Sequence, residues 1–263
     1  MRYSCFNNLL SLVWLDIKNV FASYGNLFLN SILLPIAFVL VYTQALPAFG
    51  IKTTTAHFML IGFLVLTTHN TQLGFANDLL HMLSSKYASL YKHDMQKFSL
   101  SPALLYCRYC ILYAFKSVLA NVAIIPFAIL FVPDFDVTYL SIPKTVLFFI
   151  CMTVFIATMC TLSAVIFRSN ERLWQIWPRW GILFFNVSGL RASWTTMHVA
   201  FPTIMWLDFC NPYFYVFEGM RSAIFGQAGY INFWLCCCMV IFASICSLLV
   251  GIQLFKKRFD AIG

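Results

Sequence analysis

Two apolar runs, at residues 145–167 and 231–252, constrain this chain more than any other feature. Neither run contains an Asp, Glu, Lys or Arg side chain. About twenty helical residues are enough to cross the hydrocarbon core of a bilayer, which is about 30 Å thick. Charged residues make up only 10% of the chain and hydrophobic residues 61%, whereas about 25% of a soluble domain is charged. The sequence therefore predicts an all-α membrane protein.

Further apolar segments complete a predicted set of six transmembrane helices in a single domain, residues 1–263. The four additional spans are residues 27–46, 57–76, 103–132 and 173–190. Residues 9–23 predict an amphipathic helix along the membrane surface, because apolar and polar residues alternate at helical spacing. Its apolar face comprises Leu9, Leu12, Val13, Ile17, Val20 and Phe21, and its polar face Asp16, Lys18 and Asn19. Residues 77–102 form the longest polar connection.

Two spans carry side chains that are unusual in lipid. The second span contains a polar run from Thr67 to Gln72, which we expect to face protein or water. Within it, His69 is interpreted as a hydrogen-bonded packing residue, with a proton relay as the alternative. Lys116, in the third span, either snorkels to the surface or pairs with an acid, or it binds an anionic lipid or glycan phosphate.

The distribution of basic residues predicts that both termini are cytoplasmic. An even number of spans places both chain ends on one side, and the loops on that side are the more basic. They carry Arg2, Lys18, Lys86, Lys92, Lys97, Arg168, Arg172, Lys256, Lys257 and Arg258, and the opposite loops carry Lys52, Lys144, Arg191 and Arg221. Lys and Arg are enriched in cytoplasmic loops.

Several classes of function are disfavoured by the sequence. No Gly-Lys pair occurs, which excludes a P-loop, and no Gly-x-Ser-x-Gly, His-Glu-x-x-His or paired-carboxylate motif is present. Most of the ten cysteines lie in apolar runs, where they act as small hydrophobic residues. The net charge of +8 is spread over short loops rather than gathered on a nucleic-acid-binding face. We expect no enzyme activity, no metal, no cofactor and no nucleic acid partner for this chain.

The stretch from Asn211 to Gly229 combines Asn-Pro with an acid, Glu218, and a base, Arg221, between apolar segments. Residues three apart share a helix face, so these two side chains can pair. An unpaired charge in lipid is costly, and pairing is therefore the expected state. Two roles stay open: the pair shapes a gate, or it only holds the local fold.

The order of these features resembles the permease subunits of ABC-2-type exporters, in particular the branch that exports capsular polysaccharide or O-antigen. The resemblance covers nearly the whole chain, and no single motif in it is as specific as a P-loop. It rests on Asn211-Pro212 with Glu218, Arg221 and Gly226, on Asp16 to Gly25, on Phe98 to Pro102, and on Asn170-Glu171 with Ser188-Gly189.

The resemblance implies a homodimer in the bacterial inner membrane with two cytoplasmic ATP-binding subunits, which would move a lipid-linked polysaccharide. It also implies a reentrant helical hairpin at residues 193–226, formed by two short helices near 193–206 and 211–226. A coupling helix would lie near residues 84–97, although an ordinary membrane-surface helix is the alternative. The residues implied for ATPase coupling are Lys86, Tyr87, Leu90, Tyr91 and Lys92.

Aromatic residues offer a hypothesis for the substrate, because aromatic faces stack on sugar rings. The tryptophans of the fifth span are expected to share one helix face. Candidates for a glycan pathway or gate are Trp174, Trp177, Trp180, Tyr213 and Tyr215, together with Glu218 and Arg221. Enrichment of Trp and Tyr at membrane interfaces is the alternative explanation. A drug or small-lipid exporter, a non-transporting scaffold and an enzyme of lipid-linked sugars are the competing functions.

Overall fold

Every regular element in the described part of the chain is helical. The computed structural model describes residues 2–22, 24–25, 29, 33, 37, 40–41, 45, 48–49, 56–84, 88–89, 92–93, 100–131, 138–167, 169–190, 193–200 and 202–261. The helices are α1 (Arg2–Ala22), α4 (Ala56–Ser84), α6 (Pro102–Asn121), α7 (Ile124–Phe131), α8 (Ile142–Ile166), α9 (Asn170–Val187), α10 (Trp194–Ala200), α11 (Pro202–Phe209), α12 (Pro212–Ile224) and α13 (Phe233–Asp260). The expected all-α class is confirmed for these residues.

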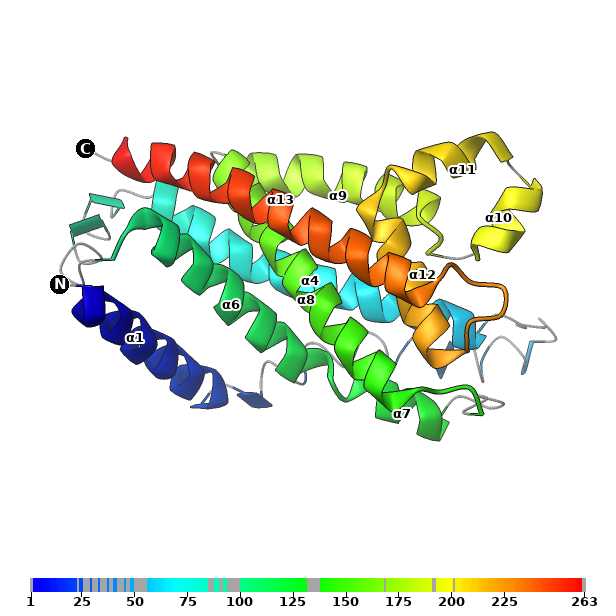
Figure 1. Cartoon of the computed structure of the whole chain (residues 1–263). Helices are drawn as coiled ribbons and strands as arrows, with labels where there is room; N and C mark the ends of the chain where they lie inside the picture. Colours follow the sequence, from blue (N-terminus) through cyan, green and yellow to red (C-terminus); the bar gives the residue numbers. More distant parts are fainter. Residues whose placement is uncertain are drawn as a thin grey trace.

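Helix α8 lies at the centre of the bundle and packs against α4, α6, α12 and α13 (Figure 1). Its inward side chains, among them Phe148, Met152 and Phe155, are buried in one continuous apolar core. Both chain ends lie at the same end of the bundle, and the short helices α10, α11 and α12 lie toward the opposite end (Figure 1).

Three described helices are long and apolar enough to cross a membrane: Pro102–Pro126, Ile142–Ile166 and Phe233–Asp260. This supports a membrane protein. Helices α4 and α9 are not among them, because α4 contains the polar run and α9 carries Glu171, Arg172 and Arg179. Most of the predicted first span, 27–46, lies outside the described residues.

Two helices continue beyond the predicted ends of their membrane spans. Helix α4 runs eight residues beyond the predicted end of the second span at 76, to Ser84, because Leu79, Leu80 and Leu83 are buried on it. Helix α13 likewise continues past 252 to Asp260, where Phe255 and Phe259 are buried.

The predicted third span, 103–132, is broken into α6 and α7. The turn falls at Val122 and Ala123. Pro126 lies four residues after Val122, and a proline ring clashes with the carbonyl four residues earlier. The interruption therefore has a local cause in the sequence.

Helix α1 differs from its predicted amphipathic pattern. It begins at Arg2 rather than near residue 9. Asp16, predicted on the polar face, makes a bidentate ion pair with Arg108 of α6, with Oδ2–Nε and Oδ1–Nη2 distances of 2.7 and 2.8 Å. Of the predicted apolar face, Phe21 is exposed, whereas Leu12 and Val20 are buried. The charge of Arg108 has drawn the acid inward.

Most of the polar run in α4 faces protein, as expected. Thr67, Thr68, His69 and Gln72 are buried, whereas Asn70 is exposed. The Gln72 amide donates to the carbonyl of Thr153 in α8 at 3.0 Å. The run therefore joins two helices inside the bundle rather than facing lipid.

Candidate functional site

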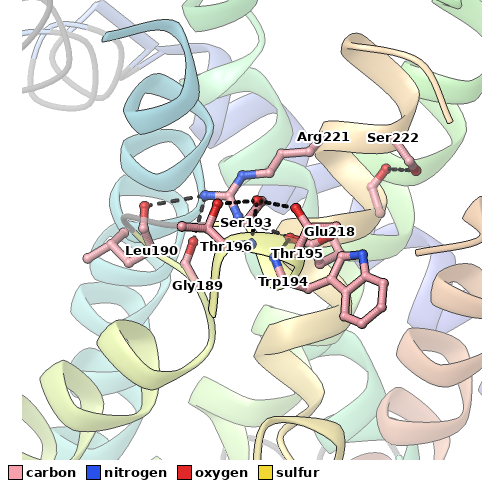
Figure 2. Close-up of polar contacts among 10 residues, drawn as sticks. Gly189, Leu190, Ser193, Trp194, Thr195, Thr196, Glu218, Arg221 and Ser222 are labelled. Carbon is pink, nitrogen blue, oxygen red and sulfur yellow. Dashed lines mark hydrogen bonds and ion pairs between the residues drawn. The ribbon is translucent and has the colours of Figure 1, made fainter. Parts of the chain in front are cut away.

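The strongest concentration of buried charge is the pair formed by Glu218 and Arg221 on α12 (Figure 2). Arg221 Nη1 lies 3.3 Å from Glu218 Oε1, and both side chains are 0% exposed. The pairing expected from their spacing is thus present. Removing two charges from water costs several kcal/mol for each ion, which is about as much as their attraction returns. The net stability of the pair therefore depends on its other hydrogen-bond partners.

The start of α12 fixes where this pair lies. Asn211 caps the helix by accepting a hydrogen bond from the Tyr213 amide at 3.1 Å, and Pro212 occupies the first turn. Gly219 lies between the two charged residues and faces α8. A Cβ atom at this position would overlap the ring of Phe148. The glycine therefore lets the charged helix pack directly on the central one.

The Glu218–Arg221 pair also connects α9 to α10. Arg221 Nη2 donates to the carbonyl of Gly189 at 2.6 Å and of Leu190 at 3.3 Å, just after α9 ends (Figure 2). The amide of Trp194, the first residue of α10, donates to Glu218 Oε1 at 3.2 Å. A cation at a helix C-terminus and an anion at a helix N-terminus both interact favourably with the helix dipole. The pair therefore holds the loop between α9 and α10.

The predicted hairpin is more subdivided than expected. The first of its two predicted helices, 193–206, is replaced by α10 and α11, and Pro202 starts the second of them. Three short helices therefore occupy residues 194–224. None of them is long enough to cross a bilayer.

A second polar cluster surrounds His69 in the middle of the bundle. The indole Nε1 of Trp177 donates to His69 Nε2 at 2.5 Å, and Tyr213 Oη lies 3.0 Å from His69 Nδ1. Cys160 Sγ is 3.8 Å from the same Nδ1, and the Phe185 ring packs edge-on against the imidazole. Four helices, α4, α8, α9 and α12, meet at this one side chain. The interpretation of His69 as a hydrogen-bonded packing residue agrees with these contacts.

The predicted aromatic pathway residues do not gather on one surface. Trp174 and Trp180 are 50% and 55% exposed, whereas Trp177 bonds to His69 inside the bundle. At 100° per residue the three tryptophans fall within an arc of about 120°, with Trp177 in its middle against the bundle and the other two at its exposed edges. Their role in a pathway stays a prediction. Tyr213 and Tyr215 are buried, and Tyr215 donates to the carbonyl of Phe209 at 2.9 Å.

Most residues implied for ATPase coupling, namely Lys86, Tyr87, Leu90 and Tyr91, lie outside the described residues. Lys92 is described. Its Nζ donates to the carbonyl of Asp260 at 3.3 Å and lies 5.9 Å from the ring centre of Phe259. Residue 92 is therefore adjacent to the C-terminal end of α13.

Lys116, one of the ambiguous residues of the sequence, lies over the ring of Phe75 in α4, with 4.7 Å between Nζ and the ring centre. A cation over an aromatic face is attracted by the ring quadrupole. This contact within the bundle accounts for a charge in α6 without requiring a ligand.

A groove of about 380 Å³ lies between α8, the α11–α12 turn and α13. Its lining includes Met159, Phe209, Tyr215, Met239 and Phe242, and it is almost entirely apolar. No group of three or more His, Cys, Asp or Glu side chains suited to a metal ion occurs in the part of the chain that the structure describes. Apolar groups rather than ions therefore match the groove.

Sequence reasoning missed the partners of both clusters. Asn211 Nδ2 donates to the Phe184 carbonyl at 3.1 Å and to the Ser188 hydroxyl, and the bond between His69 and Trp177 joins residues 108 positions apart. Only the polar run in α4 indicated that a buried polar partner was needed.

No protein-family model, curated protein or solved structure matches this chain.

Proposed function

We propose that this chain is the permease subunit of an ATP-driven exporter that moves a lipid-linked polysaccharide across a bacterial inner membrane. One observation carries the proposal. Helix α12 is too short to cross a membrane, yet it packs against α8 and α13, two of the three helices that are long enough to do so. Its fully buried ion pair also holds the first residue of α10. A short helix fixed against long ones in this way suits a reentrant gate.

The proposed arrangement has six spans, with both termini in the cytoplasm. The common position of the two chain ends in the bundle supports an even number of spans (Figure 1). Helices α10, α11 and α12 would then dip into the outer leaflet and return. Glu218 and Arg221 would hold this gate closed or set its shape, as they fasten the end of α9 to the start of α10.

The proposed partners are a second copy of this chain and two ATP-binding subunits. The contact between Lys92 and the end of α13 places part of the 77–102 connection at the same end of the bundle as the termini. A coupling helix at 84–97 would transmit movement from the ATPase to this end. Tyr87, Leu90 and Tyr91 would be its buried anchors, because aromatic side chains dominate the energetics of such interfaces.

Co-purification tests the proposal. The full chain is expressed with its candidate ATPase subunits, solubilised in detergent and weighed intact by native mass spectrometry. We expect a complex of two permease and two ATPase chains carrying a bound lipid-linked glycan. Tyr87→Ala and Tyr91→Ala should weaken the complex, whereas Tyr139→Ala, at an exposed residue just before α8, should not. Absence of any ATPase subunit would refute the proposal and favour a scaffold.

A drug or small-lipid exporter is the second candidate, and the apolar groove favours it. Its lining of methionine and aromatic side chains suits hydrocarbon better than hydroxyl-rich sugar. The two candidates differ in what stimulates ATP hydrolysis by the purified complex. Stimulation by a hydrophobic drug or short-chain lipid, with no glycan in the mass spectrum, would select this second candidate.

A further inference from the structure

We propose that α9 is a moving element, hinged at Ser188–Leu190 and latched to the bundle by the hydrogen bond between Trp177 and His69. The two ends of this helix are held in different ways. The inference goes beyond the export function and does not depend on it, because it concerns contacts within one chain.

The hinge end of α9 is held by backbone carbonyls. Arg221 binds the carbonyls of Gly189 and Leu190, and Asn211 binds that of Phe184. The Leu190 carbonyl also lies against Gly62 of α4, where a Cβ atom would come within 2.5 Å of the carbonyl oxygen. Gly189 itself has φ +90°, a conformation that only glycine adopts without strain. Gly189 is conformationally permissive, and the backbone around it is fixed to α12 and α4. Rotation of α9 about Gly189 is therefore the motion that we propose.

The other end of α9 is held by one polar side-chain contact. Among the described residues 170–183, Trp177 is the residue whose side chain hydrogen-bonds to another helix, and no second one does so. Leu173 adds apolar packing, since it is fully buried. Trp174 and Trp180 face outward. Movement of this end therefore breaks this hydrogen bond, unstacks the Trp177 ring from His69 and withdraws Leu173 from the core.

The chemistry of His69 makes this contact specific. An indole N–H can only donate, so His69 Nε2 must be the unprotonated nitrogen that accepts from Trp177. In the neutral ring, Nδ1 then carries the hydrogen and donates to Tyr213 Oη. Tyr213 belongs to α12, which stays clamped to α8, and it therefore holds the imidazole ready for Trp177 to return. The hydrogen bond between Trp177 and His69 can therefore break and re-form between the same two atoms.

Opening of the latch would uncover the neighbourhood of His69, and Cys160 can report it. The Cys160 sulfur lies 3.8 Å from His69 Nδ1 and 3.8 Å from the His69 carbonyl oxygen. Cys110 on α6 is a suitable reference, because it is also buried but does not contact His69. At rest, Cys160 is 0% exposed and Cys110 6%, so static exposure predicts that Cys110 reacts first.

The experiment measures how fast methyl methanethiosulfonate labels each cysteine in the purified full-length protein, with peptide mass spectrometry as the readout. In the wild-type protein we expect Cys160 to react faster than Cys110, against the order of static exposure. Trp177→Phe keeps an aromatic ring but removes the N–H donor. It should speed labelling of Cys160 about tenfold, as expected for the loss of one hydrogen bond, and leave Cys110 unchanged.

Trp180→Phe is the matched control, since it makes the same substitution on the exposed side of the same helix. It should label like wild type. Equal Cys160 rates in Trp177→Phe and wild type would overturn the latch, as would a wild-type Cys160 slower than Cys110. A parallel rise at both cysteines would indicate general loosening and would also overturn it. No ATPase subunit is needed, so failure of co-purification leaves this result intact.

Discussion

At the scale of single residues, Glu218 and Arg221 have the largest electrostatic consequence. Each is fully buried and each contacts backbone groups outside α12 as well as its partner. Removing one partner of a buried ion pair leaves an uncompensated charge. Replacing both often costs far less, but here the Gly189 and Leu190 carbonyls would still lose their donor.

We predict that Glu218→Gln lowers stability by about 3 kcal/mol, because Arg221 would keep its charge without an anion. Arg221→Met should cost at least as much, as it also removes the donor to Gly189. In the double variant Glu218→Gln/Arg221→Met, the loss should be smaller than the sum of the single losses by about 1–3 kcal/mol. Thermal unfolding in detergent, followed by a double-mutant cycle, measures these differences.

Ser222→Ala provides the matched control. Ser222 is buried on the same helix, and its hydroxyl donates only within α12, to the Gly219 carbonyl at 2.9 Å (Figure 2). Its removal should cost less than about 1 kcal/mol. Strictly additive losses at Glu218 and Arg221 would show that the two side chains do not stabilise each other.

How far the site could be predicted depends on sequence distance. The i, i+3 spacing of Glu218 and Arg221 was enough to expect their pairing, because a helix brings such residues together by itself. Their carbonyl partners lie about thirty residues earlier and reach them only through packing of α12 on α9. The same holds for His69, whose partners come from α9 and α12.

At the scale of elements, close helix crossings depend on glycine. A Cβ atom at Gly251 of α13 would overlap the hydroxyl and ring of Tyr106 in α6. We predict that Gly251→Ala destabilises the protein by about 1–3 kcal/mol, as overpacking does. At Gly74 of α4, no atom lies within 4 Å of the added Cβ. Gly74→Ala should therefore stabilise slightly, since alanine favours a helix. Unfolding temperatures in detergent of the two variants, compared with wild type, test this contrast.

One arginine of α13 caps another helix. Arg258 Nη1 donates to the carbonyls of Ala164, Val165 and Phe167 at 2.9, 3.2 and 2.8 Å. These groups end α8, where a cation also interacts favourably with the helix dipole. The eight residues by which α13 exceeds its predicted end include Arg258. A hydropathy pattern could not foresee them, since the segment 256–258 is charged.

We predict that Arg258→Met lowers stability by about 1–2 kcal/mol, through the lost charge-assisted hydrogen bonds. Arg258→Lys should recover part of the loss, because lysine keeps the positive charge near the helix end. It lacks the planar guanidinium group that donates to several carbonyls at once. Lys257→Met, at the neighbouring exposed position, is the control and should change little. Chemical denaturation of the three variants in detergent distinguishes these cases, and equal losses at 257 and 258 would contradict the capping role.

At the scale of the whole molecule, the apolar pattern predicted the helical class and helices long enough to span a membrane, of which the described residues contain three. The predicted fourth span, 145–167, agrees with α8 to within three residues. A long apolar run without charged residues leaves little choice about where a helix begins and ends. Helices α4 and α13 continue beyond the predicted span ends, through charged or polar residues, because packing stabilises the added turns. The break of the third span came from Pro126, whose local effect outweighs the apolar pattern around it.

The proposed six-span arrangement leads to a prediction about the whole chain. The N-terminus and the C-terminus lie at one end of the bundle (Figure 1), and Thr138–Leu140 precede α8 at the other. Epitope tags at residues 1 and 263 should therefore be digested by protease only in inside-out vesicles. A tag inserted after Tyr139, which is exposed, should be digested only in right-side-out vesicles. Intact detergent-solubilised protein, in which all three tags are accessible, is the control. Terminal tags on opposite sides would mean an odd number of spans and would remove the basis for a reentrant gate at residues 193–226.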